Sequence, residues 1–282
     1  MTKQNVFFMT GFPRAGSTLL MNILAQNPKF LGSPTSGLLN TVMKVRDSWK
    51  KNDLYRSMDE LYIYPKIRTM LKGMITGFYK KELSENIIPI DKNRIWPGHI
   101  DLLDEIFETR VKFIYPIRHI IDCLISMERI RRKSKVNHYG SSSWINEQTT
   151  IGRASNSLKN DGFFGLPIVY LREILYRKEF DRLMLVPYDN LINNPEYTLK
   201  RLYDQLGIEY FQHDFKNITQ TIIEHDLQHG YAPNSLHKIK EGELRSLNPR
   251  DMTIFDANFI NRIENEKYKD ITRLIKKHER VQ

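Results

Sequence analysis

The sequence predicts an α/β fold in which helices cover both faces of a parallel β-sheet, with further helices inserted between the strands. Short apolar runs typical of buried parallel strands recur along the 282 residues and alternate with segments whose apolar residues follow helical spacing. A glycine-rich loop joins the first apolar run to the first helical segment. This alternation is typical of a parallel sheet, and no low-complexity linker interrupts it, so we expect a single domain over residues 1–282.

The first strand is expected over residues 5–10, NVFFMT, and the loop GFPRAGST (11–18) follows it. The loop is close to the phosphate-binding P-loop pattern G-x-x-x-x-G-K-[ST], except that Ser17 stands in the lysine position and Arg14 lies inside the turn. The apolar residues of TLLMNILAQ then follow helical spacing. Backbone N–H groups of such a loop and the N-terminus of its helix form an anion cradle, and a guanidinium suits phosphate or sulfate oxygens.

The middle of the chain supplies helices and two further strands. Residues 38–84 alternate apolar and charged positions with helical periodicity, so we expect two or three helices there, with Pro65 as the only strong breaker. Strands are expected at NIIPID (86–91) and VKFIYPIR (111–118). A helix with a basic C-terminal end is expected over HIIDCLISMERIRRK (119–133).

The C-terminal half adds one more strand and a helix with clear ends. RLMLVPYDNL (182–191) has the character of a buried strand followed by a turn. The next helix is expected to have Asn194 as its cap, Pro195 at its first position and Gly207 as its stop. Two polar stretches are expected to form surface loops, namely residues 134–165 and 228–250; a mobile segment over a site is the alternative for the first.

The composition favours an anionic partner. The net charge of +10 suits a nucleotide, a nucleic acid, a sulfated or acidic substrate or a membrane surface, and a solvated basic surface explains the same number. RIRRK (129–133) raises the possibility of a nucleic-acid-binding module, but no RNA- or DNA-binding motif accompanies it, so we expect no nucleic-acid partner. The single cysteine, Cys123, lies in an apolar stretch and is expected to be buried filler.

No targeting or membrane segment is expected. No run approaches the ~20 apolar residues that a helix needs to span a bilayer. The apolar residues near the N-terminus are too few for a signal peptide and lead directly into the glycine loop. We therefore expect a cytoplasmic location.

Two segments resemble motifs of the sulfotransferases that use 3′-phosphoadenosine 5′-phosphosulfate (PAPS), closest in style to the tyrosylprotein and carbohydrate branches. In that family the 5′-phosphosulfate loop reads [R/K]-[S/A]-G-[T/S]-T-L, and RAGSTL matches at every position. A second family motif is a strand followed by an arginine and, eight residues later, a serine; FIYPIRHIIDCLIS supplies Arg118 and Ser126. The resemblance implies that these two residues converge on the 3′-phosphate. It implies that the 5′ group binds a loop formed by Arg14, Ala15, Gly16, Ser17, Thr18 and Leu19.

Two further segments resemble the family more loosely. VPYDNLINNPEYTLKRLYDQLGI is similar to the Y-E-D-L segment and its helix, which implies that Tyr188 contacts the nucleotide; a tyrosine at the edge of the core is the alternative. NSLHKIKEGELRS is similar to a late nucleotide loop, which implies that Ser235 and Lys238 contact the adenosine or the 3′-phosphate; a solvated basic loop is the alternative. Together the matches span residues 5–250 in the order of the family.

Sulfuryl transfer requires stabilisation of the leaving phosphate and removal of a proton from the acceptor. The resemblance implies that Arg14 and Lys92 stabilise the leaving group; a surface lysine is the alternative for Lys92. The glutamate that serves as base in the tyrosylprotein branch has no counterpart here, because its position falls in GSPTSG (32–37), which we expect to line the acceptor pocket. His99 is our first candidate for the base, since imidazole titrates near neutral pH, and Asp91 is the second. A structural or surface role is the alternative for each.

We therefore expect an enzyme that moves a sulfuryl group from PAPS to a hydroxyl or amine acceptor and releases 3′-phosphoadenosine 5′-phosphate (PAP), without a metal ion. The acceptor is expected to be a small molecule, a carbohydrate or a peptide. One alternative is a P-loop kinase that uses Asp189 to hold Mg²⁺. Another is a non-catalytic relative that binds PAP, which the missing glutamate keeps open.

Overall fold

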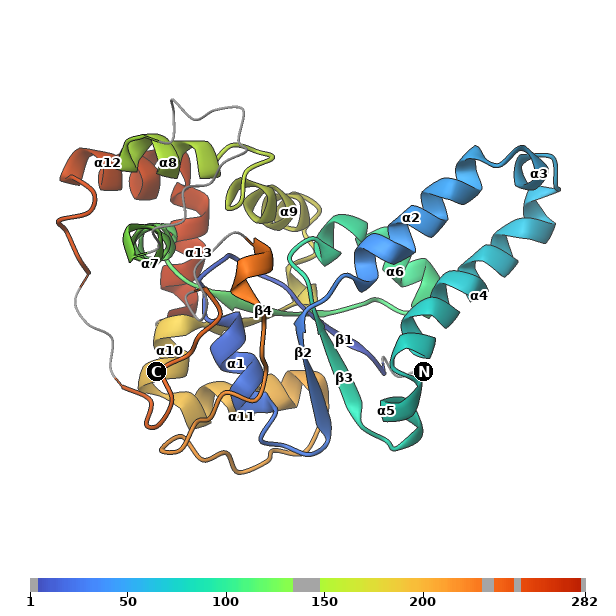
Figure 1. Ribbon diagram of the computed structural model, residues 1–282, viewed down its shortest axis with the longest axis horizontal. Coiled ribbons are helices and arrows are strands. Elements are labelled where there is room, and N and C mark those ends of the chain that lie inside the picture. The colour runs from blue at the N-terminus through green and yellow to red at the C-terminus, as the bar shows by residue number, and fades with distance from the viewer. Residues whose placement is uncertain (1–4, 134–147, 230–235, 246–249, 280–282) are drawn as a thin grey trace.

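The computed structural model describes residues 5–133, 148–229, 236–245 and 250–279. Its centre is a five-stranded sheet in the order β2-β3-β1-β4-β5, in which every neighbouring pair is parallel. The predicted α/β class is therefore confirmed (Figure 1). The strands are β1 (Phe7–Met9), β2 (Phe30–Thr35), β3 (Ile88–Lys92), β4 (Phe113–Ile117) and β5 (Leu183–Pro187).

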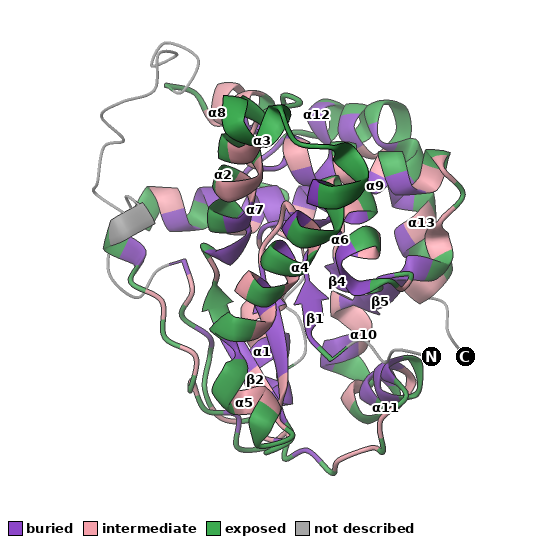
Figure 2. Ribbon diagram, turned by 90° about the vertical axis from the view of Figure 1, so that its right-hand side faces the viewer, coloured by how far each residue is buried: buried purple, intermediate pink, exposed green. Residues whose placement is uncertain are grey.

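Both faces of the sheet are buried, which explains why the inner strands β1 and β4 are continuously apolar rather than alternating. Successive side chains of β1 enter different apolar clusters: Phe8 belongs to one, while Phe7 and Met9 belong to the other. The ring of Phe8 lies 4.5 Å from that of Trp96, centroid to centroid. In Figure 2 the strands are coloured as buried along most of their length.

Helices supply the apolar stripes that cover the two faces. On the side of Met9 lie α1 (Ser17–Leu24) and α11 (Pro195–Leu206). The cluster that contains Phe8 takes buried residues from several other helices, namely α6 (Ile100–Phe107), α7 (Ile120–Lys133), α9 (Gly165–Tyr176), α12 (Ala257–Asn261) and α13 (Lys269–Glu279). Burial of such stripes on a sheet is the main source of stability in this fold class.

Residues 38–84 form four helices, where the sequence predicted two or three. Asn52 caps the second of them and Asp59 caps the third, each by accepting a backbone N–H bond. Pro65 lies inside the third helix and does not end it. The first and third pack side by side and project from the body of the molecule (Figure 1). The four are α2 (Leu38–Lys51), α3 (Asp53–Arg56), α4 (Glu60–Phe78) and α5 (Lys80–Ser84).

The sequence predicted the ends of helices most accurately where proline and glycine mark them. Helix α11 begins at Pro195 and ends before Gly207, whose φ of 67° is left-handed, as expected. Asn194 occupies the cap position, but its side chain makes no capping bond. Cys123 is buried, as predicted. The remaining elements are α10 (Tyr188–Asn193), the π-helical turn η5 (Arg262–Lys267) and the 3₁₀ turns η1 (Trp96–His99), η3 (Phe180–Arg182) and η4 (Asp226–His229).

The expectation of loops is confirmed for residues 236–245 and wrong for part of 134–165, while residues 230–235 and 246–249 lie outside the described residues. Within 134–165 the structure has helix α8 (Thr150–Ser157), whose first turn is capped by the hydroxyl of Thr149; residues 134–147 lie outside the described residues. Residues 236–245 form a loop that contacts the rest of the chain through an antiparallel bridge between Ile218 and Gly242 and through further hydrogen bonds, including one from the backbone N–H of Ile239 to Gln220. No helix among the described residues is long and apolar enough to cross a membrane.

Candidate functional site

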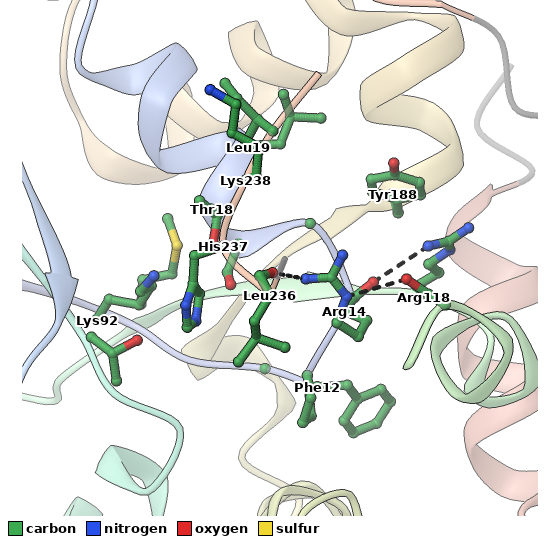
Figure 3. Close-up of a pocket in the computed structure, with 18 of the residues that line it drawn as sticks. Phe12, Arg14, Thr18, Leu19, Lys92, Arg118, Tyr188, Leu236, His237 and Lys238 are labelled. Carbon is green, nitrogen blue, oxygen red and sulfur yellow. Dashed lines mark hydrogen bonds between the residues drawn. The ribbon is translucent and has the colours of Figure 1, made fainter. Parts of the chain in front are cut away.

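The sequence-predicted site lies at the carboxyl edge of the sheet, where parallel strands deliver their loops to one place. The glycine loop follows β1, which lies between β3 and β4. Lys92 is the last residue of β3, and Arg118 follows the last residue of β4. A cavity of about 1160 Å³ opens there, and Figure 3 shows part of its lining.

The loop from Gly11 to Gly16 needs unusual backbone angles. Gly11 has φ 122° and Gly16 has φ 92°, values that favour glycine. A Cβ atom on Gly11 would overlap the carbonyl oxygen of Pro116, and one on Gly16 would overlap the ring of Tyr188. Arg14 adopts φ 64° despite its side chain, which places some strain in the middle of the loop. The two glycines therefore let the backbone pass closely against β4 and Tyr188.

Helix α1 begins directly after this loop, and no side chain caps it. Gly16 occupies the cap position, and residues 16–19 line the cavity. The first N–H groups of a helix have no partner within the helix, and the helix dipole adds positive potential there. The loop and the first turn of α1 thus form an anion cradle open to the cavity.

Four of the predicted binding residues come together at this cradle (Figure 3). Nε of Arg14 donates a hydrogen bond of 3.2 Å to the hydroxyl of Ser126, and Nη1 of Arg14 donates to the carbonyl of Leu236. Nη1 of Arg118 lies 3.4 Å from the carbonyl oxygen of Arg14. The guanidinium of Arg118 also stacks 4.3 Å from the ring centroid of Tyr188.

Arg14 and Arg118 place two guanidiniums at the cradle. Neither forms an ion pair with a carboxylate among the residues that the structure describes, and the buried Nε of Arg118 has no hydrogen-bond partner there. Burial lowers the pKa of the Arg14 guanidinium, and the charge of Arg118 lowers it further. Two partly buried cations held side by side are costly unless an anion compensates them. The pair therefore fits a phosphate or sulfate group.

The rest of the lining is also basic. Eight lysines and arginines line the cavity against two glutamates, Glu241 and Glu243. Lys238 lines it as predicted, and its Nζ lies 3.8 Å from a carboxylate oxygen of Glu241. Arg131, which the sequence reasoning did not assign to the site, also lines it, and its buried Nε has no hydrogen-bond partner among the described residues. The other cations are Lys92, Arg94, Lys240 and Arg245.

Lys92 forms a buried ion pair at the side of the cavity. Its Nζ contacts a carboxylate oxygen of Glu224, and less than a tenth of either side chain is exposed. Burial lowers the pKa of Lys92, although the charge of Glu224 acts in the opposite direction. Burial by itself would raise the pKa of Glu224, but Lys92 and His237 outweigh it and the net shift is downward. Glu224 is thus held as a carboxylate.

His237 completes this cluster and lines the cavity. Its Nδ1 lies 2.7 Å from a carboxylate oxygen of Asp226, whose other oxygen accepts a hydrogen bond from the backbone N–H of Leu236. Its Nε2 lies 3.3 Å from Oε2 of Glu224. Burial and the charge of Lys92 lower the pKa of His237, while the two carboxylates oppose them. A neutral imidazole held by a carboxylate therefore stands beside the cavity.

The two bases suggested by the sequence lie elsewhere. Neither His99 nor Asp91 is among the residues that line the cavity. His99 ends η1, and burial, with a contribution from Arg46, lowers its pKa. Asp91 is fully buried and accepts hydrogen bonds of 2.6 Å from Tyr79 Oη and 2.7 Å from Trp96 Nε1. Successive residues of a strand point to opposite faces, so Asp91 points away from the side that its neighbour in β3 occupies.

Among the other residues predicted for the site, some line the cavity and others do not. Ser235 lies outside the described residues. Ala15 belongs to the loop, but its side chain is packed in the core. From the segment GSPTSG only Thr35 lines the cavity, because Gly32 and Ser33 lie buried within β2. Asp189, proposed as a metal ligand in the kinase alternative, does not line the cavity.

Three residues of the site were missed for physical reasons. Glu224 lies in a polar segment without regular structure, so no periodicity marks it. His237 lies within the segment expected to be a nucleotide loop, and its position between Ser235 and Lys238 was the available signal. Arg131 belongs to a basic run that by itself suggests only a charged helix end. No group of three or more side chains suited to hold a metal ion occurs in the described ranges.

The chain matches one protein family and is similar to several solved structures. The sequence profile described as the sulfotransferase family matches residues 7–212. The sulfotransferase domain of the olefin synthase from Synechococcus PCC 7002 is 20% identical, with a TM-score of 0.49 over 99% of this chain and 96% of that one. The sulfotransferase domain from the curacin biosynthetic pathway is 16% identical, with a TM-score of 0.49 over 99% and 98%.

A sulfotransferase from Mycobacterium tuberculosis H37Rv is 16% identical, with a TM-score of 0.42 over 74% of this chain and 69% of that one. No curated protein sequence matches the chain significantly.

Proposed function

Because this chain belongs to the sulfotransferase family, we propose that it transfers a sulfuryl group from PAPS to a hydroxyl or amine acceptor and releases PAP. The observation that carries the proposal is the pair formed by Arg14 and Arg118, two guanidiniums without a carboxylate partner in the described chain, beside the uncapped start of α1. PAPS carries one phosphate on its 3′ position and a phosphosulfate on its 5′ position. Such a molecule supplies the negative charge that this pair lacks.

The residues present fit the donor. The backbone amides of the loop and of the first turn of α1, with the hydroxyls of Ser17 and Thr18, suit the 5′ group. Arg118, whose buried Nε has no partner among the described residues, suits the 3′-phosphate together with Ser126. Tyr188 and Lys238 also line the cavity, and in this proposal they contact the nucleoside. The cavity of about 1160 Å³ is large enough for a nucleotide and an acceptor side by side.

Bound PAPS supplies a sulfuryl group whose bond to the 5′-phosphate is the bond that breaks. The acceptor oxygen or nitrogen forms a new bond to sulfur, and the phosphate oxygen takes the electron pair of the broken bond. The loop amides, Arg14 and Lys92 stabilise the charge that develops on this oxygen. The loop amides and Arg14 are already oriented in the cradle before the reaction begins, and Lys92 would act from its buried pair with Glu224 at the side of the cavity.

His237 takes the proton of the acceptor in this proposal. With its own proton on Nδ1, bonded to Asp226, the imidazole presents Nε2 as the accepting atom. The imidazolium that forms lies between the carboxylates of Asp226 and Glu224, which stabilise its charge. His99 and Asp91 are disfavoured because neither lines the cavity.

Transfer itself is tested with PAPS that carries labelled sulfate. The purified chain is incubated with this donor and, in separate reactions, with sugars, phenols and tyrosyl peptides, aliphatic alcohols and amines. We expect label to move to at least one class, with stoichiometric release of PAP. If PAP binds but no class is labelled, the non-catalytic alternative replaces the enzymatic one. Transfer of phosphate from Mg·ATP to an acceptor would instead support the kinase.

A further inference from the structure

Helices α2, α3 and α4 form an arm that projects from the body of the molecule (Figure 1). The inner seam of the arm is packed: Ile63 and Ile67 are buried, and the rings of Trp49 and Tyr64 lie 5.3 Å apart, centroid to centroid. We define the arm tip as residues 50–62, all of which are exposed (Figure 2). The tip is therefore an exposed surface on a well-packed support.

The arm tip displays large apolar side chains that are exposed and belong to neither apolar core cluster. The exposed fractions are 88% for Leu61, 75% for Leu54, 59% for Tyr62, 41% for Met58 and 38% for Tyr55. Single exposed apolar residues are ordinary on protein surfaces. Five of them within thirteen consecutive residues, on the most protruding element, form a patch that favours a partner.

Cations outnumber carboxylates along the arm as a whole, although the arm tip itself carries three of each. Residues 44–72 contain eight lysines and arginines against four carboxylates. Two of the carboxylates at the tip are engaged within the arm: Asp53 pairs with Arg56 at 3.3 Å, and Asp59 caps α4. In the described chain six of the cations have no ion-pair partner, namely Lys44, Lys50, Lys51, Lys66, Arg68 and Lys72. The surplus positive charge is complementary to an anionic surface.

We propose that the arm tip docks on a lipid bilayer that contains anionic phospholipids. Tyrosine and leucine side chains partition into the boundary between headgroups and acyl chains, and lysines place their stems along this boundary while their ammonium groups meet phosphates. Each cation near such a surface adds about 1 kcal/mol of attraction. Docking is peripheral, since no helix in the described residues could cross the bilayer.

The shape of the arm favours lipid over a protein partner. The tip is a convex end, and the large described cavity lies at the sheet edge instead. A fluid bilayer accepts a convex apolar end by rearranging, whereas a folded protein would need a matching groove. The inference rests on the arm alone and does not depend on the proposed sulfuryl transfer.

The test is flotation of the full chain with vesicles. One set contains phosphatidylcholine only and a second contains phosphatidylcholine with about 30% phosphatidylglycerol, an anionic fraction large enough for surface attraction. We compare the wild type with Leu54→Ser/Leu61→Ser, with Lys50→Glu/Lys51→Glu, and with the control Tyr176→Ser. Tyr176 is 85% exposed on α9, outside the arm. Circular dichroism and thermal melting check that each variant is folded.

We expect the wild type and Tyr176→Ser to float with the anionic vesicles. Each double variant should lose roughly tenfold or more of that affinity. The leucine variant removes apolar area that the bilayer would bury, and the lysine variant reverses two charges that attract anionic headgroups. Wild-type protein that stays unbound, or a leucine double variant that binds like the wild type, would overturn the proposal. Light scattering on the protein without vesicles adds a second check of its oligomeric state. If the wild type is a dimer and Leu54→Ser/Leu61→Ser is a monomer, the arm tip is an interface between two copies of the chain, and lipid docking is overturned.

Discussion

Arg118 is the residue whose surroundings most directly indicate a bound anion. It stacks on Tyr188, lies close to the carbonyl of Arg14 and keeps a buried Nε without a partner in the described chain. Arg118→Ala should weaken PAP binding by about 1.5–3 kcal/mol, the usual contribution of a hydrogen bond to a charged group. Isothermal titration calorimetry measures the loss. Arg129→Ala is the control, because Arg129 pairs with Asp251 and does not line the cavity. An unchanged affinity in Arg118→Ala would contradict the assignment of the 3′-phosphate.

His237 is the residue that the account assigns to proton removal. His237→Gln should lower kcat by roughly 10²-fold or more, the range of general-base contributions, with little change in PAP affinity. Its pKa lies below the usual 6.5 because of burial and Lys92. The neutral, active form is therefore lost as the pH falls through that lowered value. The wild-type rate should have an acidic limb below pH 6.5 that is missing in the variant.

The matched control for this prediction is His99→Gln, which removes an imidazole that does not line the cavity. It should keep both the rate and the acidic limb. If His99→Gln loses the limb and His237→Gln keeps it, proton removal belongs to His99 as the sequence suggested.

At the scale of elements, function depends on the unit of β1, the glycine loop and α1. Gly16 combines a φ of 92° with close contact to the ring of Tyr188. Gly16→Ala should therefore displace the loop and lower PAP affinity by roughly tenfold or more while the chain stays folded, because left-handed strain and overlap each cost about 1–3 kcal/mol. Gly73→Ala is the control: it lies within α4, and nothing lies within 4 Å of its added Cβ. Equal PAP affinities of both variants would show that the loop tolerates the side chain.

This same unit is the part of the fold that the sequence predicted best, because its signals are local. A buried apolar run, a glycine turn and a helical stripe each follow from a few adjacent residues. Strand β2 was not predicted, since Gly32 and Pro34 within it suggest a loop. Its position at the edge of the sheet, with a register shift between Gly32 and Thr35, explains why such residues are tolerated.

The sequence did not predict the group that we assign to remove the acceptor proton. Asp91 and His99 lie near Lys92 in the sequence, which suggests either as the base, but strand alternation and the turn η1 place them away from the cavity. Glu224 and His237 reach Lys92 from segments 132 and 145 residues away along the chain. Such long-range contacts leave no periodic signal in the sequence.

At the scale of the whole molecule, the positive charge that gives the chain its net charge of +10 is concentrated in two places. One is the cavity, with eight cations against two glutamates, and the other is the arm. The composition indicated an anionic partner without placing it. The cavity contains a glycine loop that can hold a single anionic group, whereas the arm is a convex surface without such a loop. We therefore expect the cavity and the arm to bind different anions.

The central claim is that the cavity holds a nucleotide with a 3′-phosphate through arginine rather than through a metal ion. Titration calorimetry of the wild-type chain in EDTA, with PAP and with adenosine 5′-phosphate, tests it most directly. PAP should bind without metal and roughly 10-fold or more tighter than adenosine 5′-phosphate, since it adds the charge that Arg118 receives. Failure of PAP to bind in EDTA, or tighter binding of Mg·ATP that EDTA abolishes, would contradict the account.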